Sequence, residues 1–356
     1  MFFCLHMVAR INSIWLDYVR VFATFCVVLL HSAAPLLDKY GKLNDVDWWA
    51  GNLYDSLARI SVPLFFMVSG ALLLGKDEGV RVFVKKRFEK VFLPLVVWSF
   101  IYLFWRVFFE ASAQLSFYSL YSMVLTPVYY HLWFLYAIIG LYLFVPILRV
   151  IVCHAPESYL KYYVALWFLA AALIPLSEWL TGLSSRIDLR GVSGMSGYLV
   201  VGYLFSRRLV SVGVMRGAVV LFVTSTFFAA IVTYFLTVKN DGKFVGYFYG
   251  YLTPNVILAS CSAFVVIKYA VTRFDFFRHP AVLAAVSSLS STSFGVYLIH
   301  AMYLYLLAEG RLGVDILDLD LGEIFTVPLT VILVFAVSHL SVLILRKIPI
   351  VARIVP

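Results

Sequence analysis

The chain has 356 residues, of which 63% are hydrophobic and only 13% are charged. Soluble proteins average roughly 45–50% apolar and about 25% charged residues, so this composition excludes an ordinary soluble domain and indicates a protein embedded in lipid. The net charge of +9 is explained more simply by basic loops that orient a membrane protein than by nucleic-acid binding. The cysteines Cys4, Cys26, Cys153 and Cys261 show no metal-ligand or disulfide spacing, and we expect no metal site.

Hydropathy along the chain predicts an all-α bundle of about ten transmembrane helices, because about 20 mostly apolar residues are needed to cross a bilayer. The first segment is longer than the apolar region of a cleavable signal peptide. We predict one domain over residues 1–356, with no appended soluble domain. The predicted spans are residues 15–37, 55–75, 88–110, 131–150, 159–180, 192–206, 215–236, 248–271, 289–309 and 324–346, the sixth being short and rich in glycine.

The loops between these spans differ in charge. Basic stretches lie on one side: KDEGVRVFVKKRFEK at 76–90, the Arg207–Arg208 pair and RKIPIVAR at 346–353. The other side includes the acidic stretch DILDLDLGE at 315–323. Cytoplasmic loops of membrane proteins carry an excess of Lys and Arg. We therefore expect both termini in the cytoplasm.

The first span, LDYVRVFATFCVVLLHS at 16–32, carries polar groups on a single face. At about 100° per residue, Asp17, Arg20, Thr24 and His31 fall on one narrow stripe. Charge inside a bilayer costs about 2.5–3.5 kcal/mol on the mildest scales and usually marks a functional site. The alternative is an ion pair between Asp17 and Arg20 that only packs the bundle.

The same stripe separates two kinds of chemistry. Arg20 and His31 are eleven residues apart, a rise of about 16 Å, which places Arg20 in the inner half of the membrane and His31 near the outer face. Arginine is suited to gripping phosphate or carboxylate, and an imidazole that titrates near neutral pH is suited to general-base catalysis. This favours a reaction between a cytoplasmic anionic donor and an acceptor at the outer face.

The second span contains Arg59 near its outer end. We interpret Arg59 either as a site residue or as a side chain whose head group reaches the membrane interface. Pro63 and Ser69–Gly70 are expected to interrupt this helix, and to let backbones approach or carbonyls open toward a cavity. In the fourth span, His131 is expected at the depth of His31, while Trp133 fits the aromatic belt of an interface as well as a site.

The ninth span contains Tyr297 and His300, which are either residues of a functional site or hydrogen-bonded packing residues. His339 in the tenth span is interpreted as a packing residue. The basic residues before the third span have two interpretations, topology or an anion patch for a phosphorylated cofactor; they are Arg81, Lys85, Lys86, Arg87 and Lys90.

Five stretches in register resemble the membrane acyltransferase-3 family of bacterial integral membrane enzymes. They are Arg20 to His31 with Asp17 before them, PLFFMVSG at 63–70 with Arg59 before it, KKRFEKVFLPLVVWS at 85–99, HLWFL at 131–135 and SFGVYLIH at 293–300. The resemblance covers nearly the whole chain. Within this family the chain is similar to the stand-alone members that O-acetylate envelope glycans, such as the enterobacterial common antigen.

The resemblance implies transfer of an acyl group, usually acetyl, from cytoplasmic acetyl-CoA to a glycan hydroxyl beyond the inner membrane. It implies His31 as the catalytic histidine and Arg20 as a catalytic or cofactor-binding residue, with Asp17 expected to orient Arg20. Lys85, Lys86 and Arg87 are expected to help bind the CoA phosphates. Arg59, His131, Trp133, Tyr297 and His300 are further site candidates.

Several alternatives remain open at this stage. An acetyl-histidine intermediate is an alternative to direct transfer. A proton-coupled transporter would use Asp17, Arg20, His31 and His300 as a relay. An inactive membrane scaffold is the third possibility. The expected partners are acyl-CoA, a lipid-linked or surface glycan and the bilayer, with a homo-oligomer left open and no nucleic acid.

Overall fold

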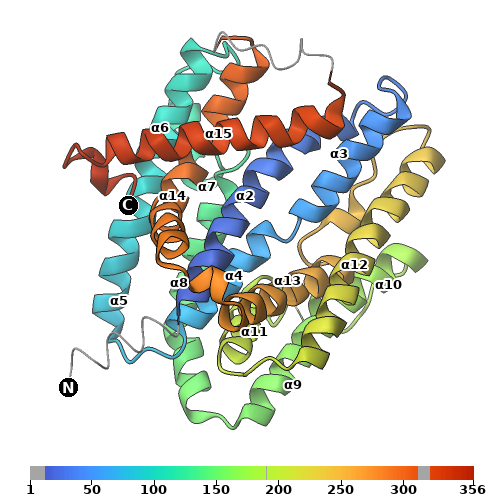
Figure 1. Cartoon of the computed structure of the whole chain (residues 1–356), viewed down its shortest axis with the longest axis vertical. Coiled ribbons are helices and arrows are strands. Elements are labelled where there is room, and N and C mark those ends of the chain that lie inside the picture. The colour runs from blue at the N-terminus through green and yellow to red at the C-terminus, as the bar shows by residue number, and fades with distance from the viewer. Residues whose placement is uncertain (1–12, 190, 312–320) are drawn as a thin grey trace.

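A computed structural model of the chain describes residues 13–189, 191–311 and 321–356. These residues form helices and turns, with no strand among them, which confirms the all-α prediction. Cys4 and most of the acidic stretch 315–323 lie outside the described residues. The helices shown in Figure 1 are α2 (Ile14–Leu37), α3 (Asp45–Ala58), α4 (Ser61–Leu73), α5 (Val80–Arg87), η1 (Phe88–Phe92), α6 (Leu93–Phe108), α7 (Phe117–Leu125), α8 (Trp133–His154), α9 (Glu157–Phe168), η2 (Leu169–Leu173), α10 (Ile174–Thr181), α11 (Ser196–Ser206), α12 (Val212–Lys239), α13 (Pro254–Arg273), α14 (Pro280–Ala308) and α15 (Glu323–Leu345).

Nine helical stretches in the described part of the chain are long and apolar enough to cross a membrane. Each corresponds to one of the predicted spans, and together they make the protein a multi-pass membrane protein. The placement of both termini in the cytoplasm remains a prediction. The nine stretches are Ile14–Leu37, Asp45–Leu73, Val80–Phe108, Trp133–His154, Glu157–Thr181, Val212–Lys239, Tyr247–Arg273, Pro280–Ala308 and Glu323–Leu345.

The sixth predicted span, residues 192–206, is wrong as a full crossing. Helix α11 has 11 residues, a length of about 16 Å against about 30 Å of hydrocarbon. Gly194 has a φ of +92°, in the left-handed region, so the glycine-rich start of the segment turns before the helix begins. Apolar composition indicated burial here, but it did not indicate a helix of spanning length.

The second predicted span also differs from the structure. It begins at Asp45, where Asn44 caps the amino end of α3 by accepting a hydrogen bond from the Asp47 backbone, and it breaks between α3 and α4. The break precedes Pro63, which lies in the first turn of α4, a position that tolerates proline. Helix α4 then continues through Ser69 and Gly70, so the predicted interruption there is wrong.

The expectation that backbones approach here is confirmed, because Gly70 allows α4 and α11 to pack in backbone contact. A Cβ atom on Gly70 would lie 1.9 Å from the carbonyl oxygen of Leu199, and one on Gly202 would lie 2.1 Å from that of Met67. Small residues permit this close approach between membrane helices. The contact fixes α4, which lines the site described below.

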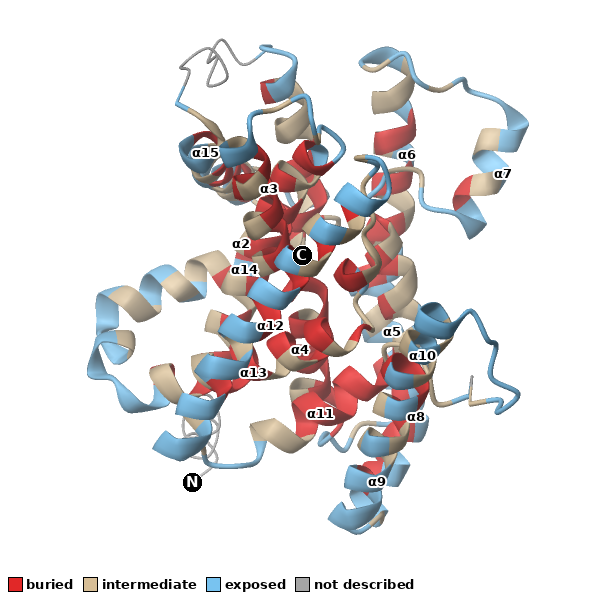
Figure 2. Cartoon of the chain, turned by 90° about the vertical axis from the view of Figure 1, so that its right-hand side faces the viewer, coloured by how far each residue is buried: buried red, intermediate tan, exposed pale blue. Residues whose placement is uncertain are grey.

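Helix α2 lies at the centre of the bundle. It contacts α3, α4, α13, α14 and α15, which surround it in Figure 1. Buried residues gather on α4, α11 and the other central helices, whereas α9 and α7 are largely exposed (Figure 2). The central position of α2 means that its polar stripe faces other protein rather than lipid.

Candidate active site

The first half of the α2 stripe is an ion pair joined to a second helix. Arg20 Nη1 lies 2.9 Å from Asp17 Oδ1 and donates a hydrogen bond to Ser290 Oγ of α14 at 2.7 Å. Ser290 in turn donates to Asp17 Oδ1 at 2.7 Å. This closed triangle orients the guanidinium, as predicted for Asp17. The Arg20 side chain remains 30% exposed, so it is available to a ligand.

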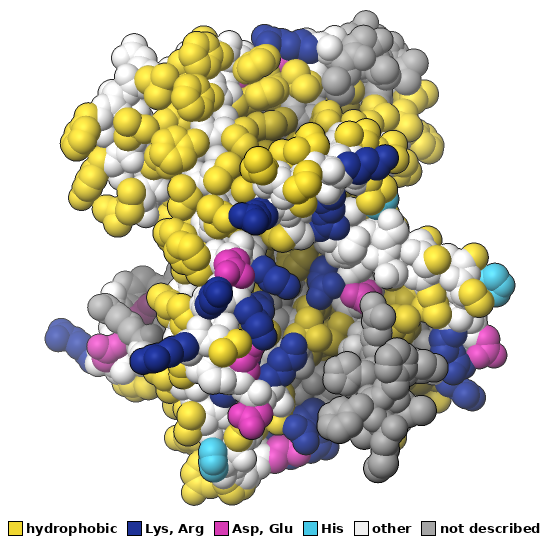
Figure 3. Space-filling view, turned by 90° about the vertical axis from the view of Figure 1, so that its left-hand side faces the viewer, with side chains coloured by type: hydrophobic (Ala, Val, Ile, Leu, Met, Phe, Trp, Pro, Cys, Tyr) yellow, Lys and Arg dark blue, Asp and Glu magenta, His cyan; other side chains and the backbone are white. Residues whose placement is uncertain are grey.

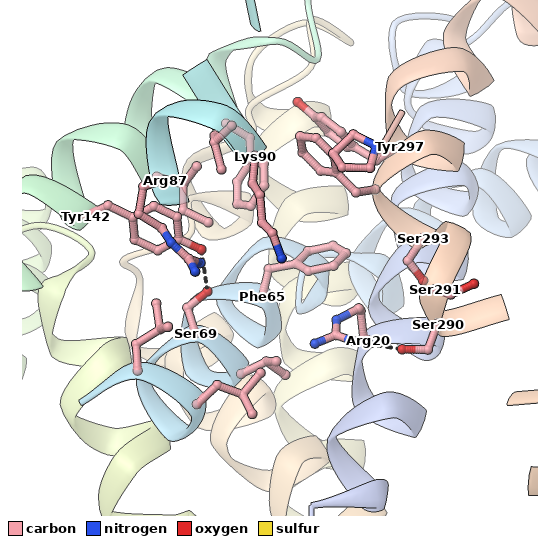
Figure 4. A pocket seen from close by; sticks show the side chains of 18 residues that line it. Arg20, Phe65, Ser69, Arg87, Lys90, Tyr142, Ser290, Ser291, Ser293 and Tyr297 are labelled. Carbon is pink, nitrogen blue, oxygen red and sulfur yellow. Dashed lines mark hydrogen bonds between the residues drawn. The ribbon is translucent and has the colours of Figure 1, made fainter. Parts of the chain in front are cut away.

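Arg20 lines a cavity of about 350 Å³. Its walls come from α2, α4, α5, η1, α8 and α14, and Figure 4 shows Arg20, Arg87 and Lys90 directed into it from different elements. Ser69 and Tyr142 contact each other across one wall, with their oxygens 3.3 Å apart. A cavity with three cationic side chains and an otherwise mostly apolar lining suits an anionic group attached to an apolar arm.

The predicted basic cluster divides in two around this cavity. Arg87 lines it and stacks its guanidinium over Phe83 and Tyr142, whereas Lys85 and Lys86 are absent from the lining. Lys86 pairs with Glu78 instead, at 2.5 Å. Lys85 and Lys86 therefore do not line this cavity, and their role in binding the CoA phosphates stays a prediction.

Lys90, which belongs to the predicted anion patch but was not among the residues expected to bind the CoA phosphates, takes the third cationic position. It lies in the π-helical segment η1, between α5 and α6. Such π-bulges frequently occur at functional sites because they change the direction of side chains within a helix. The i, i+3 spacing from Arg87 to Lys90 was the available sequence signal. Figure 3 shows Lys and Arg gathered around a hollow on the face that carries α5 and the carboxyl-terminal end.

Three histidines from different parts of the chain meet beyond this cavity. The ring centroids of His31 and His300 are 5.4 Å apart, and those of His300 and His131 are 5.2 Å apart. His131 and His300 are buried, with 1% and 0% exposure. In the described part of the chain they form no group of metal ligands.

Tyr297 joins this cluster to the cavity. Its hydroxyl donates to the backbone oxygen of His131 at 2.5 Å, and its ring lines the Arg20 cavity. The backbone oxygen of Tyr297 lies 2.7 Å from His300 Nδ1. Of the predicted candidates, His300 therefore lies beside His31, and His131 and Tyr297 lie beside His300.

His31 itself opens into a second cavity of about 270 Å³. This cavity is lined by Tyr129, Tyr130 and Tyr305, together with residues of α2, α14 and α15. The His31 ring contacts the Tyr130 ring at a centroid distance of 4.7 Å. The Tyr129–Tyr130 pair directly precedes His131 in the sequence, yet these residues were missed as site candidates.

Burial keeps the phenols of Tyr129 and Tyr130 protonated. It raises the pKa of Tyr130 and, together with a hydrogen bond to Glu110, the pKa of Tyr129. Tyr129 donates to Glu110 Oε1 at 2.6 Å, and Trp105 Nε1 donates to the same oxygen at 3.0 Å. Neutral aromatic rings with fixed hydroxyls provide a platform for a polar but uncharged ligand.

Arg59 and Trp133 lie near the cluster without lining either cavity. Arg59 pairs with the fully buried Asp55, stacks over the Tyr249 ring at 4.6 Å and interacts electrostatically with His31. It therefore does not reach out to the membrane interface, because the buried carboxylate one turn earlier holds it. Trp133 stacks on Tyr251 with centroids 5.4 Å apart.

A continuous set of side chains thus connects two cavities of different chemistry, a basic one beside Arg20 and an aromatic one beside His31. A multi-pass helical bundle with a cationic cavity, an aromatic cavity and imidazoles between them has the features of a membrane group-transfer protein. A family model described as an acyltransferase domain matches residues 13–346, and the chain belongs to this acyltransferase family. Neither the comparison with curated proteins nor that with solved structures gives a match.

Proposed function

We propose that this protein transfers an acetyl group from cytoplasmic acetyl-CoA to a hydroxyl of a cell-envelope glycan at the outer face of the bacterial inner membrane. The observation that carries the proposal is the pair of cavities at the two ends of the α2 stripe, with His31, His131 and His300 between them. The acyltransferase family supplies the reaction class.

In this proposal the basic cavity receives the donor. Arg20, Arg87 and Lys90 hold phosphate oxygens of acetyl-CoA through charge-assisted hydrogen bonds. The apolar part of the lining, which includes Phe65 and Phe134, accommodates the pantetheine arm. Tyr297 lies at the far end of the arm, where it contacts His131 and His300.

The aromatic cavity receives the acceptor. Tyr129, Tyr130 and Tyr305 present rings and hydroxyls to a sugar, which is itself uncharged and polar. His31, the one histidine of the three that lines this cavity, removes the proton from the sugar hydroxyl. The hydroxyl oxygen then attacks the thioester carbonyl carbon and the C–S bond breaks.

Arg59 is our candidate for stabilising the negative charge that develops on the carbonyl oxygen. It is the cation that interacts with His31, and its Nε atom has no hydrogen-bond partner among the described residues. A fixed cation in a water-poor site is worth several kcal/mol to such a transition state.

The test uses inverted membrane vesicles, which expose the cytoplasmic face, from cells that make the protein. Vesicles are incubated with radiolabelled acetyl-CoA, and label is counted in the membrane glycan fraction. Label in glycan together with release of free CoA supports the proposal. Uptake of a solute without CoA release would favour a proton-coupled transporter, and silence in both assays would favour a scaffold.

A further inference from the structure

His300 presents one bound and one free ring nitrogen. Its Nδ1 lies 2.7 Å from the backbone oxygen of Tyr297, and its Nε2 has no hydrogen-bond partner among the described residues. A carbonyl oxygen only accepts, so in the neutral ring the proton sits on Nδ1 and Nε2 carries a lone pair. The backbone thereby fixes His300 in the tautomer that has a basic Nε2.

The free nitrogen is buried in the interior of the bundle. His300 is 0% exposed, and no bond to either nitrogen of neighbouring His131 is formed by the described residues. A buried polar atom without a partner costs about 1–3 kcal/mol and needs an explanation such as a catalytic role. The two adjacent imidazoles of His131 and His300 together have three such atoms, so the explanation has to cover both rings.

His300 lies between the two cavities. Its ring stacks on that of His31, with centroids 5.4 Å apart and an interplanar angle of 25°, and His31 lines the aromatic cavity. Tyr297, one helical turn before His300 in α14, lines the basic cavity. His300 therefore lies between the side where a hydroxyl proton is removed and the side from which a thiol departs.

We propose that His31 and His300 form a two-histidine proton carrier for the acetyl transfer. This inference rests on the function proposed above. His31 takes the proton as the hydroxyl oxygen attacks the thioester carbon. The two stacked rings then rotate toward each other, and His31 passes that proton to the Nε2 atom of His300. When the C–S bond breaks and its electron pair goes to sulfur, His300 Nε2 gives the proton to sulfur. The products are the acetyl ester and neutral CoA thiol, and both histidines return to their starting state.

The surroundings explain why the carrier is needed. A bare thiolate or a lasting imidazolium inside a membrane bundle is costly, because little water is present to solvate it. A second imidazole on the donor side lets the sulfur leave as a neutral thiol. It also keeps the net charge of the passage constant through each turnover.

The experiment compares His300→Asn and His300→Gln with the parent in the inverted-vesicle assay, counting all membrane product labelled from acetyl-CoA. Asparagine keeps an N–H donor for the Tyr297 carbonyl, and glutamine keeps a polar atom near the position of Nε2. Neither can carry the proton. We expect kcat to fall about 100-fold or more in both variants, with the KM for acetyl-CoA unchanged.

His339→Asn is the matched control. His339 lies on α15 and its Nδ1 is 2.7 Å from the Thr292 hydroxyl of α14, so it is a histidine bonded to the same helix but outside the cluster. This variant is expected to keep the parent rate. Protein amount and a cooperative thermal transition in detergent confirm that each variant folds.

A rate series in mixtures of H₂O and D₂O separates proton transfer from a structural role. The parent is expected to show a curved dependence of kcat on the D₂O fraction, since two protons are in flight, and the His300 variants are expected to show a linear one. Parent rates in the His300 variants, or a dependence unchanged by the substitution, would overturn the carrier and leave the proposed function standing. No labelled product from the parent protein would overturn both.

Discussion

The two cavities share helices α2 and α14 but are otherwise built in different ways. The basic cavity near Arg20 takes cations from α2, α5 and η1, and hydroxyl groups from α4, α8 and α14. The aromatic cavity near His31 owes two of its tyrosines, Tyr129 and Tyr130, to one short segment before α8. The first is therefore sensitive to how helices pack, and the second depends on the local course of one loop. This difference suggests a charged donor on one side and a neutral acceptor on the other.

The largest expected effect comes from the residue that joins the two sides. His31→Ala should lower acetyl transfer about 1000-fold, because it removes the proposed general base. The rate of label transfer in vesicles measures this loss. Ser32→Ala is the control, since among the described residues the Ser32 hydroxyl bonds only the Val28 backbone oxygen within α2. Parent activity in a folded His31→Ala protein would remove the proposed role of His31.

Substitutions confined to the basic cavity should affect donor binding alone. Arg20→Ala and Arg87→Ala should each raise the KM for acetyl-CoA by about tenfold or more, since a hydrogen bond to a charged group is worth about 1.5–3 kcal/mol. Lys85 is a neighbour of Arg87 that does not line the cavity, so Lys85→Ala should leave the KM for acetyl-CoA unchanged. Equal effects of Arg87→Ala and Lys85→Ala would mean that the basic segment acts through its overall charge.

The dependence of the basic cavity on packing can be tested at Gly70. Gly70→Ala forces a methyl group against the Leu199 backbone and should cost about 1–3 kcal/mol of folding free energy. A lowered thermal midpoint in detergent is the expected result. Gly140→Ala in α8, where the added atom meets nothing within 4 Å, should not lower it. Unchanged stability of Gly70→Ala would contradict the close contact of α4 with α11.

The smallest effect is expected at the loop beside the basic cavity. Glu78 accepts hydrogen bonds from Lys86 and from the buried Arg149, and the Lys86 bond is the main cause of its lowered pKa. A carboxylate with a lowered pKa stabilises the fold near neutral pH, and this contribution is lost as the pH falls below the ordinary glutamate value and through the lowered one.

Glu78→Gln should change the KM for acetyl-CoA only about two- to threefold, because Glu78 does not line the basic cavity and its main partner, Lys86, is exposed. It should also flatten the fall in thermal midpoint between neutral pH and about pH 4. An identical pH dependence in parent and variant would show that this carboxylate does not secure the loop.

The sequence by itself determined the features that depend on neighbouring residues in one helix. Mean apolarity located nine of the spans, and the 100° rotation per residue placed Asp17, Arg20 and His31 on one face of α2. Both are properties of a local helix in lipid and need no knowledge of its neighbours. The resemblance drawn from five short motifs also pointed to the family that the match over residues 13–346 shows.

Only the tertiary structure decided which residues meet. It selected Arg87 and Lys90 over Lys85 and Lys86, paired Arg59 with Asp55 and brought His131 and His300 to His31. It also ended α11 at 11 residues, where composition indicated a crossing. The physical reason is that hydropathy reports how apolar a segment is, whereas the rotation of each helix and the contacts between distant helices are fixed by packing.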